Sequence, residues 1–291
     1  MFVFKAAVVG AGTMGGEVAQ AIASAEVPVV LRDVDSVPLE QGLAAARRAT
    51  ERQLRGLVKR ERMTERQAAI ELEAIIGRIE ATTGYGSFGD VDLAIEAVPE
   101  RMDVKHEVFA ELDAATPGHA ILASNTSGLS ISELATGTTR PDKVVGMHFF
   151  LPASVMRLVE VVEGEATSEE TVQAVAGFAQ QIRKQPIRCL DQAGFVVNRI
   201  LAAGLGELWR AQAEEGLPFE QVDAAVRDAK AAPMGPFELS DWIGLDTLLH
   251  LVEHLRESYG ERFHVAPELS ERVAAGDLGR KTGRGFYEHG D

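Results

Sequence analysis

A glycine-rich turn near the N-terminus constrains the fold of this chain more than any other stretch. Gly10, Gly12 and Gly15 form the pattern G-x-G-x-x-G directly after the apolar run "KAAVVG" and before "GEVAQAIASA", which has helical spacing. The first glycine permits a tight turn, the second lets backbone approach a pyrophosphate, and the third allows close packing of helix on strand. The pattern predicts a strand, a turn and a helix that together bind a dinucleotide.

The second predicted strand, "VPVVLRD" (27–33), adds a cofactor preference. It ends in Asp33, about where a carboxylate accepts hydrogen bonds from the adenosine ribose hydroxyls. That carboxylate repels a 2′-phosphate, so NAD is favoured over NADP, although Arg32 beside it weakens the preference. We also assign Thr13 and Met14, within the turn, to the cofactor site, where the helix N-terminus attracts phosphates. A glycine cluster that serves only the turn is the alternative.

Strand-like and helix-like runs alternate through the first two thirds of the chain, although residues 36–80 read as helical and charged, with no strand signal. This alternation predicts an α/β fold with a doubly wound (Rossmann) parallel sheet and helices on both faces. The strand signal ends near residue 192. We therefore predict an NAD-binding domain over 1–191 and an all-helical domain over 192–291, with the ligand in a cleft between them.

Composition excludes several classes of partner and compartment. The 291 residues carry a formal net charge of −15, which argues against nucleic acid or an anionic membrane as partner. No apolar run is long enough to cross a bilayer, and glycines interrupt the first apolar stretch, so we expect no secretory leader. The single cysteine, Cys189, fits a reducing compartment. We therefore expect a soluble protein of the cytoplasm.

One histidine and one acid stand out because each lies inside an apolar run. His148 is in "GMHFF" and Glu160, twelve positions later, is in "LVEVVEG". Both runs predict strands of one sheet, so the two side chains can pair. The pattern leaves two interpretations open: a buried histidine with a structural partner, or a pair that transfers a proton.

The chain resembles the short-chain L-3-hydroxyacyl-CoA dehydrogenases, a family that includes the 3-hydroxybutyryl-CoA dehydrogenases. The matching stretches run in family order over nearly the whole chain: "VVGAGTMG", "AIEAVPE", "ILASNTS", "GMHFF", "LVEVVEG", "GFVVNRI", "PMGPFEL", "IGLDT" and "GRKTGRGFY". The resemblance implies NAD-dependent oxidation of a 3-hydroxyacyl-CoA to the 3-ketoacyl-CoA and its reverse, in fatty-acid or butanoate metabolism. It also implies a homodimer, in which the helical domain over 192–291 serves substrate binding and dimerisation.

The resemblance implies roles for individual residues. His148 matches the catalytic base, Glu160 its orienting partner, and Ser127 and Asn198 the residues that hold the substrate oxygen. Without the family, Ser127 reads as a turn cap and Asn198 as a partner in a helix–helix hydrogen bond.

Two further pairs of charged residues gain roles from the same match. Glu100 and Lys105 are placed near the nicotinamide ribose, although on their own they read as solvated charges at a helix start. Lys59 and Arg60 are placed against the CoA phosphates, in a stretch, 47–66, that holds eight basic residues against three glutamates. A solvated helical face is the alternative for that stretch.

The chain departs from the family where "HFFLP" replaces "HFFNP", so that Leu151 stands in place of an asparagine. The leucine side chain cannot donate or accept a hydrogen bond, so more than one class of substrate is compatible with the sequence. The alternatives are a dehydrogenase of free or carrier-bound hydroxy acids and a non-enzymatic NAD(H)-binding protein. We expect no metal, because His250 and His254 share a helical spacing without a third ligand nearby.

Overall fold

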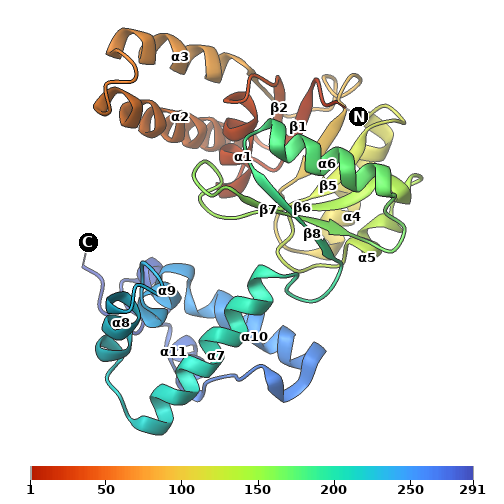
Figure 1. Ribbon diagram of the computed structural model, residues 1–291. Helices are drawn as coiled ribbons and strands as arrows, with labels where there is room; N and C mark the ends of the chain where they lie inside the picture. The colour runs from red at the N-terminus through yellow and green to blue at the C-terminus, as the bar shows by residue number, and fades with distance from the viewer. Residues whose placement is uncertain (1, 291) are drawn as a thin grey trace. The chain divides into compact units, whose positions relative to one another are not determined.

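The computed structural model describes residues 2–290 and divides into two compact units, one up to Gln192 and one from Ala193 onward. Each unit has its own hydrophobic core. Figure 1 draws the first unit in red to green and the second in green-blue to blue.

The first unit is built on one sheet, which has eight strands in the order β3-β2-β1-β4-β5-β6-β7-β8 within the described residues. The strands are β1 Ala6–Val9, β2 Val29–Arg32, β3 Ile79–Thr82, β4 Leu93–Glu96, β5 Ile121–Ser124, β6 Val144–Phe149, β7 Leu158–Glu163 and β8 Gln185–Leu190. The chain steps from β1 outward to β3, and then returns to β4 on the other side of β1. This confirms the predicted doubly wound sheet.

The sequence predicts a parallel sheet, but the observed sheet has one antiparallel pair. Strands β6 and β7 pair antiparallel, while every other neighbouring pair is parallel. The cause is the length of the connection. A parallel pair needs a crossover of a dozen or more residues, whereas only residues 150–157 separate β6 from β7.

The prediction that residues 36–80 contain no strand is also wrong, because β3 begins at Ile79. Two helices, α2 Ser36–Lys59 and α3 Glu65–Gly77, are followed at once by β3. Strand β3 lies at the edge of the sheet, and of its four residues only Ile79 is buried. An edge strand with one buried side chain has almost no apolar pattern to read.

Helices cover both faces of the sheet (Figure 1). They are α1 Thr13–Ala23, α4 Met102–Ala115, α5 Ile131–Ala135 and α6 Glu169–Gln181, with a short 3-10 turn at Pro141–Lys143. Val18 of α1 and Phe178 of α6 belong to one core cluster, so these two helices share a face. Because crossovers are right-handed and the chain leaves β1 and β4 in opposite directions, α4 lies on the other face.

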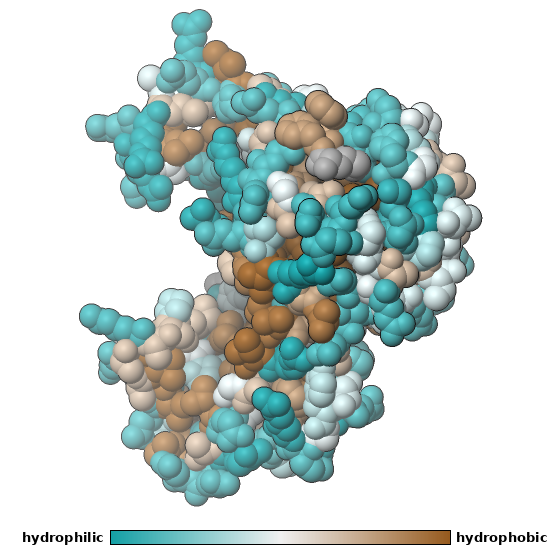
Figure 2. Space-filling model, turned by 45° about the vertical axis from the view of Figure 1, so that its right-hand side comes forward, coloured by the Kyte–Doolittle hydropathy of each residue, from teal (hydrophilic) through white to brown (hydrophobic). Residues whose placement is uncertain are grey.

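Helices α2 and α3 form an arm that extends away from the sheet (Figure 1), with mostly hydrophilic side chains on the face seen in Figure 2. A capping box begins α3: Thr64 accepts a hydrogen bond from the Gln67 N–H, and Gln67 accepts one from the Thr64 N–H. At its base the arm packs closely on α1, because a Cβ on Gly16 would lie only 2.5 Å from the Gly42 carbonyl oxygen.

The second unit is helical, as predicted. Its helices are α7 Val197–Glu215, α8 Phe219–Asp228, α9 Pro236–Ile243, α10 Leu245–Tyr259 and α11 Pro267–Ala275, with 3-10 turns at Gly260–Arg262 and Arg280–Thr282. Trp209, Phe237 and Val252 lie in its core. The buried carboxylate of Asp241 accepts the N–H groups of Phe286 and Tyr287, which ties the C-terminal segment to α9. Among the described residues, no helix is long and apolar enough to span a membrane.

Candidate active site

Four adjacent strands, β1, β4, β5 and β6, end at one edge of the sheet. They are parallel neighbours, so the segments that follow them lie together. The strand order reverses direction at the β1–β4 pair, and open α/β sheets bind ligands beyond the carboxyl ends of the strands at such a point. The predicted cofactor and catalytic residues of the first unit are found mainly at this edge.

The glycine turn after β1 has the shape that a dinucleotide requires. Gly10 has φ of +99°, and a Cβ there would lie 2.5 Å from the Ala97 carbonyl oxygen. A Cβ on Gly15 would lie 1.7 Å from the Gly10 carbonyl oxygen, so both positions need glycine for the fold. A Cβ on Gly12 would meet nothing within 4 Å. The turn is therefore open at Gly12. Thr13, the first residue of α1, is also exposed. Met14 is half-buried and packs against the core.

Asp33 lies beside this turn at the end of β2. Its Oδ2 accepts the Ala11 N–H at 2.7 Å and its Oδ1 accepts the Val34 N–H at 2.7 Å. Arg32 is buried, and its guanidinium lies over the Tyr85 ring, 4.4 Å from the centroid. Because this cation is stacked rather than exposed, the carboxylate of Asp33 is the charge presented next to the turn. That arrangement favours ribose hydroxyls over a 2′-phosphate.

His148 and Glu160 face each other across the antiparallel pair. They are direct partners in the β6–β7 register, and His148 Nδ1 lies 2.7 Å from Glu160 Oε2. Glu160 is fully buried and His148 is nearly so. A carboxylate accepts only, so the imidazole donates from Nδ1, and the neutral ring then has Nε2 as its proton acceptor. This is the geometry of a base held in one tautomer by an acid.

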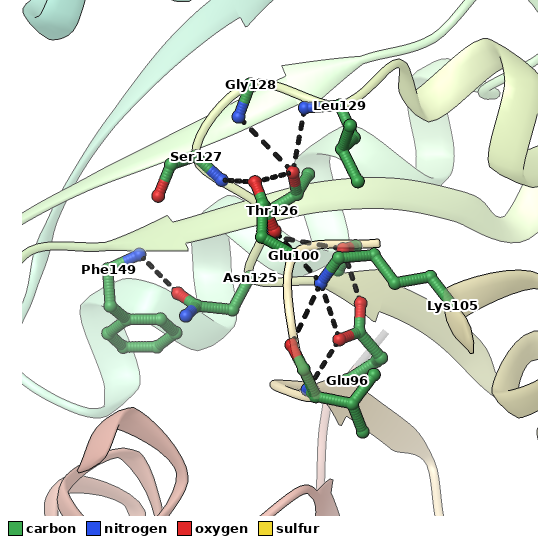
Figure 3. A network of polar contacts seen from close by, with 11 residues as sticks. Glu96, Glu100, Lys105, Asn125, Thr126, Ser127, Gly128, Leu129 and Phe149 are labelled. Carbon is green, nitrogen blue, oxygen red and sulfur yellow. Dashed lines mark hydrogen bonds and ion pairs between the residues drawn. The ribbon is translucent and has the colours of Figure 1, made fainter. Parts of the chain in front are cut away.

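Lys105 lies in a buried network at the same edge of the sheet (Figure 3). Its side chain is 1% exposed, and Nζ lies 2.7 Å from Glu96 Oε1 and 3.2 Å from Glu100 Oε2. The interpretation of Lys105 as a solvated charge is therefore wrong. Glu100, by contrast, has 46% of its side chain exposed.

Glu100 in turn holds the loop that contains Ser127 (Figure 3). Its Oε1 accepts the Thr126 hydroxyl at 2.6 Å and the Ser127 N–H at 2.8 Å. The Thr126 oxygen also accepts the N–H groups of Gly128 and Leu129, at 3.2 and 2.8 Å. The exposed side chain of Ser127 is thus carried by a loop whose backbone is fixed on both sides.

Sequence reasoning missed three residues of this site: Glu96, Asn125 and Thr126. The Asn125 Oδ1 accepts the Phe149 N–H at 2.8 Å, which joins the end of β5 to the strand of His148 (Figure 3). Glu96 carried a readable signal, since it is an acid at the end of the apolar run "LAIE", as Glu160 is within its own run. Asn125 and Thr126 carried none beyond their place in a polar loop.

The segment that follows β6, where the chain departs from the family it resembles, is fixed by two sets of hydrogen bonds. Lys184 donates from Nζ to the carbonyls of Ala153 and Met156, at 2.5 and 2.8 Å, and Ser154 donates to Glu17 of α1 from its N–H and hydroxyl. Burial lowers the pKa of Lys184, while the charge of Glu17 acts in the opposite direction. Leu151, at the start of this segment, is 44% exposed.

The remaining predicted residues lie elsewhere. Lys59 ends α2 and Arg60 follows it, both exposed at the far end of the arm and apart from the network of Figure 3. Asn198 is the second residue of α7 and belongs to the second unit. His250 and His254 lie on α10. Within residues 2–290 no three His, Cys, Asp or Glu side chains are grouped as a metal site would require.

Comparison with known proteins decides the family. Residues 5–192 match the model for the 3-hydroxyacyl-CoA dehydrogenase NAD binding domain, and residues 194–289 match that for the 3-hydroxyacyl-CoA dehydrogenase C-terminal domain. This chain belongs to the 3-hydroxyacyl-CoA dehydrogenase family. The family and the cofactor predicted from sequence, NAD, are thereby confirmed, and the open turn at Gly12 together with Asp33 fits that cofactor.

Similar proteins cover nearly the whole length of the chain. The 3-hydroxybutyryl-CoA dehydrogenase of Clostridioides difficile is 39% identical over 98% of this chain and 99% of its own. The human mitochondrial hydroxyacyl-coenzyme A dehydrogenase is 37% identical over 97% of this chain and 90% of its own. The crystal structure of (S)-3-hydroxybutyryl-CoA dehydrogenase from Ralstonia eutropha superposes with a TM-score of 0.90 at 38% identity, over 99% of this chain and 100% of that one.

The geometry of the glycine turn predicts opposite outcomes for two substitutions. Gly12→Ala leaves the unfolding midpoint unchanged but weakens NADH binding about tenfold or more, because the added methyl occupies the open side of the turn. Gly15→Ala lowers the unfolding midpoint, because its Cβ meets the Gly10 carbonyl. Denaturant unfolding and NADH fluorescence titration measure both. Equal NADH affinity in wild type and Gly12→Ala would contradict this account of the turn.

Proposed function

We propose that the chain interconverts an L-3-hydroxyacyl-CoA and the 3-ketoacyl-CoA with NAD, acting on a short acyl chain such as that of 3-hydroxybutyryl-CoA. The observation that carries this proposal is the 2.7 Å contact of His148 with buried Glu160 at the carboxyl edge of an NAD-binding sheet. Relatives of similar length are named 3-hydroxybutyryl-CoA dehydrogenase, and one longer relative is the alpha subunit of a fatty acid oxidation complex. The setting we propose is therefore fatty-acid or butanoate metabolism.

His148 acts as the base in the oxidative direction. Its Nε2 takes the proton of the 3-hydroxyl as the C–O bond gains double-bond character, and gives it back in reduction. Accepting the hydride that leaves C3 is the chemistry that NAD supplies when bound. The Glu160 carboxylate keeps the proton on Nδ1 and stabilises the imidazolium by a charge-assisted hydrogen bond, worth about 1.5–3 kcal/mol.

Two polar side chains hold the substrate oxygen in this proposal. Ser127 donates from its hydroxyl, presented by the loop that Glu100 fixes, and Asn198 donates from its amide. Glu100 and Lys105 contribute to the nicotinamide ribose side of the site. The support for Glu100 is its half-exposed carboxylate in the same network as the Ser127 backbone.

The acyl carrier in this proposal is CoA, whose phosphates meet Lys59 and Arg60. Both residues are exposed on the arm, within the basic stretch 47–66 of an otherwise acidic chain. Leu151 makes the start of the following segment apolar, which suits a short acyl group. None of the contacts in the described residues favours a free hydroxy acid or a non-enzymatic role over this reaction.

We further propose that the protein is a cytoplasmic homodimer that pairs through its helical unit. Two apolar side chains of α7 support pairing, since Ile200 is 68% exposed and Leu208 is 37% exposed. Figure 2 shows hydrophobic side chains gathered on the visible face of this unit.

The reaction is tested by absorbance at 340 nm with acetoacetyl-CoA and NADH. We expect rapid oxidation of NADH, a much slower rate with NADPH, and a fall in kcat of about 10³-fold in His148→Gln. Glu160→Gln should also lower kcat, because a neutral amide neither fixes the same tautomer nor stabilises the imidazolium. NADH binding by each variant is the control for folding.

Two outcomes of that assay would overturn the proposal. Wild-type protein that binds NADH tightly but does not turn over acetoacetyl-CoA would exclude the CoA substrate, and free or carrier-bound 3-keto acids would be assayed next. Full activity in His148→Gln would exclude its role as the base.

Charge reversal on the arm tests the CoA contact. Lys59→Glu with Arg60→Glu should raise KM for acetoacetyl-CoA about 2- to 5-fold per charge at low salt and leave kcat unchanged. KM for an acetoacetyl thioester that lacks the CoA phosphates should not change. Arg66→Glu, another exposed cation of the arm, is the matched control. The same rise in KM for both thioesters would show that the two residues do not meet the phosphates.

Light scattering after size exclusion tests the oligomer. We expect a mass near twice the chain mass of 31.3 kDa, and a shift to the monomer in Ile200→Asp with Leu208→Asp. Ile70→Asp removes an apolar side chain of the arm that is 63% exposed, and it should leave the mass unchanged. A wild-type monomer at micromolar concentration would refute the dimer.

A further inference from the structure

Glu96 takes no part in the steps described above, yet its carboxylate is fully buried at the carboxyl end of β4. It accepts hydrogen bonds from three donors: Lys105 Nζ at 2.7 Å, the Val98 N–H at 2.7 Å and the Ser124 hydroxyl at 2.6 Å. One acid thus joins the segment after β4, helix α4 and the end of β5.

From Glu96 two routes lead to the loop of Ser127. On the first, Lys105 bridges Glu96 to Glu100, and Glu100 accepts the Ser127 N–H at 2.8 Å (Figure 3). On the second, the hydroxyl of Ser124 donates to Glu96 and accepts the Thr126 N–H at 3.2 Å. Both routes end on adjacent residues of one loop. The position of that loop therefore depends on the carboxylate of Glu96.

Stability alone does not account for buried charges in this arrangement. Removing two charges from water costs several kcal/mol per ion, and well-packed apolar residues often replace a buried pair without loss of stability. The alternating charges instead fix side-chain positions, because each group holds the next one in place. The series runs from Glu96 through Lys105 to Glu100. The last of them reaches the surface beside Ser127.

We propose that Glu96 is a positioning residue for Ser127, acting through Lys105 and Glu100 on one side and through Ser124 on the other. This inference rests on the proposed function, in which the Ser127 hydroxyl holds the substrate oxygen. It assigns Glu96 no contact with substrate or cofactor. Its effect is on how well the oxygen is held during hydride transfer, and therefore on kcat.

The test compares Glu96→Gln with Asp113→Asn. Asp113 also pairs with a buried cation, Arg140, at 2.7 Å, but at the amino edge of the sheet, where the segments before β5 and β6 lie. Both substitutions neutralise one partner of a buried pair and lower stability. We expect Glu96→Gln to lower kcat with acetoacetyl-CoA about 10- to 100-fold, the range that a small misplacement near reacting groups produces. Asp113→Asn should keep kcat per folded molecule, as denaturant unfolding and circular dichroism define the folded fraction.

A second pair of variants tests the loop end of the same path without disturbing the ion pair. Thr126→Val removes the hydroxyl that donates to Glu100 and accepts two N–H groups, and should lower kcat to a similar extent. Thr126→Ser keeps the hydroxyl, and its kcat should stay within about twofold of the wild-type value. In the double variant that combines Glu96→Gln with Thr126→Val, the two losses of kcat should not add, because residues of one network show coupled effects. If Glu96→Gln does not fold, Ser124→Ala takes its place, because it removes the hydroxyl that joins Glu96 to the Thr126 N–H; unchanged kcat in that variant would overturn the role of Glu96.

The outcomes separate this inference from the proposed function. A wild-type chain without turnover would overturn both. Turnover that His148→Gln abolishes but Glu96→Gln and Thr126→Val leave intact would overturn the positioning role alone. Equal losses of kcat in Glu96→Gln and Asp113→Asn would also overturn it, since both would then reflect general loosening of the fold.

Discussion

The candidate site depends on the parallel alignment of β1, β4, β5 and β6. Parallel strands in register deliver their carboxyl ends to one edge, so the glycine turn, the acid Glu96 and the loop of Ser127 come together although they lie far apart in the chain. Right-handed crossovers then place helices on both faces and leave that edge uncovered by helices of the first unit. The contacts of Glu100 with Ser127 and of Asn125 with Phe149 in Figure 3 join segments that this alignment makes neighbours.

The single reversal in the sheet has a chemical consequence. Because β7 returns antiparallel to β6, His148 and Glu160 become direct cross-strand partners whose side chains leave the same face. Parallel strands would have placed them on a slanted ladder with a long connection between them. The short connection also puts Leu151 and the segment held by Lys184 and Glu17 immediately after β6, the strand of His148. His148 and the segment that differs from the family are thus parts of one hairpin.

Two fully buried acids at this edge each have a partner. Glu160 is paired with His148, and Glu96 is paired with Lys105, at 2.7 Å in both cases. Burial without a partner would cost each group several kcal/mol, so the pairs constrain one another's positions closely. In both, a fully buried acid holds a second side chain that lies nearer the surface. The site therefore combines a held imidazole with a held loop.

The amino-acid sequence by itself determined the fold class, the family and the cofactor, because glycine spacing, apolar periodicity and long motifs are local properties of the chain. It also singled out His148 and Glu160, since an ionisable residue inside an apolar run is conspicuous. It did not reveal strand β3, because an edge strand has almost no apolar pattern. It did not reveal the antiparallel direction of β7 either, because the short connection after β6 implies that direction only once the bounds of both strands are known.

Tertiary structure alone decided the partners of Lys105 and Thr126. Lys105 reads as a surface residue until α4 packs on the sheet and encloses it between Glu96 and Glu100, and Thr126 gains its role only when Glu100 lies against its loop. Hydrogen bonds between segments far apart in sequence have no local signature, because they depend on distances that exist only after the strands have aligned.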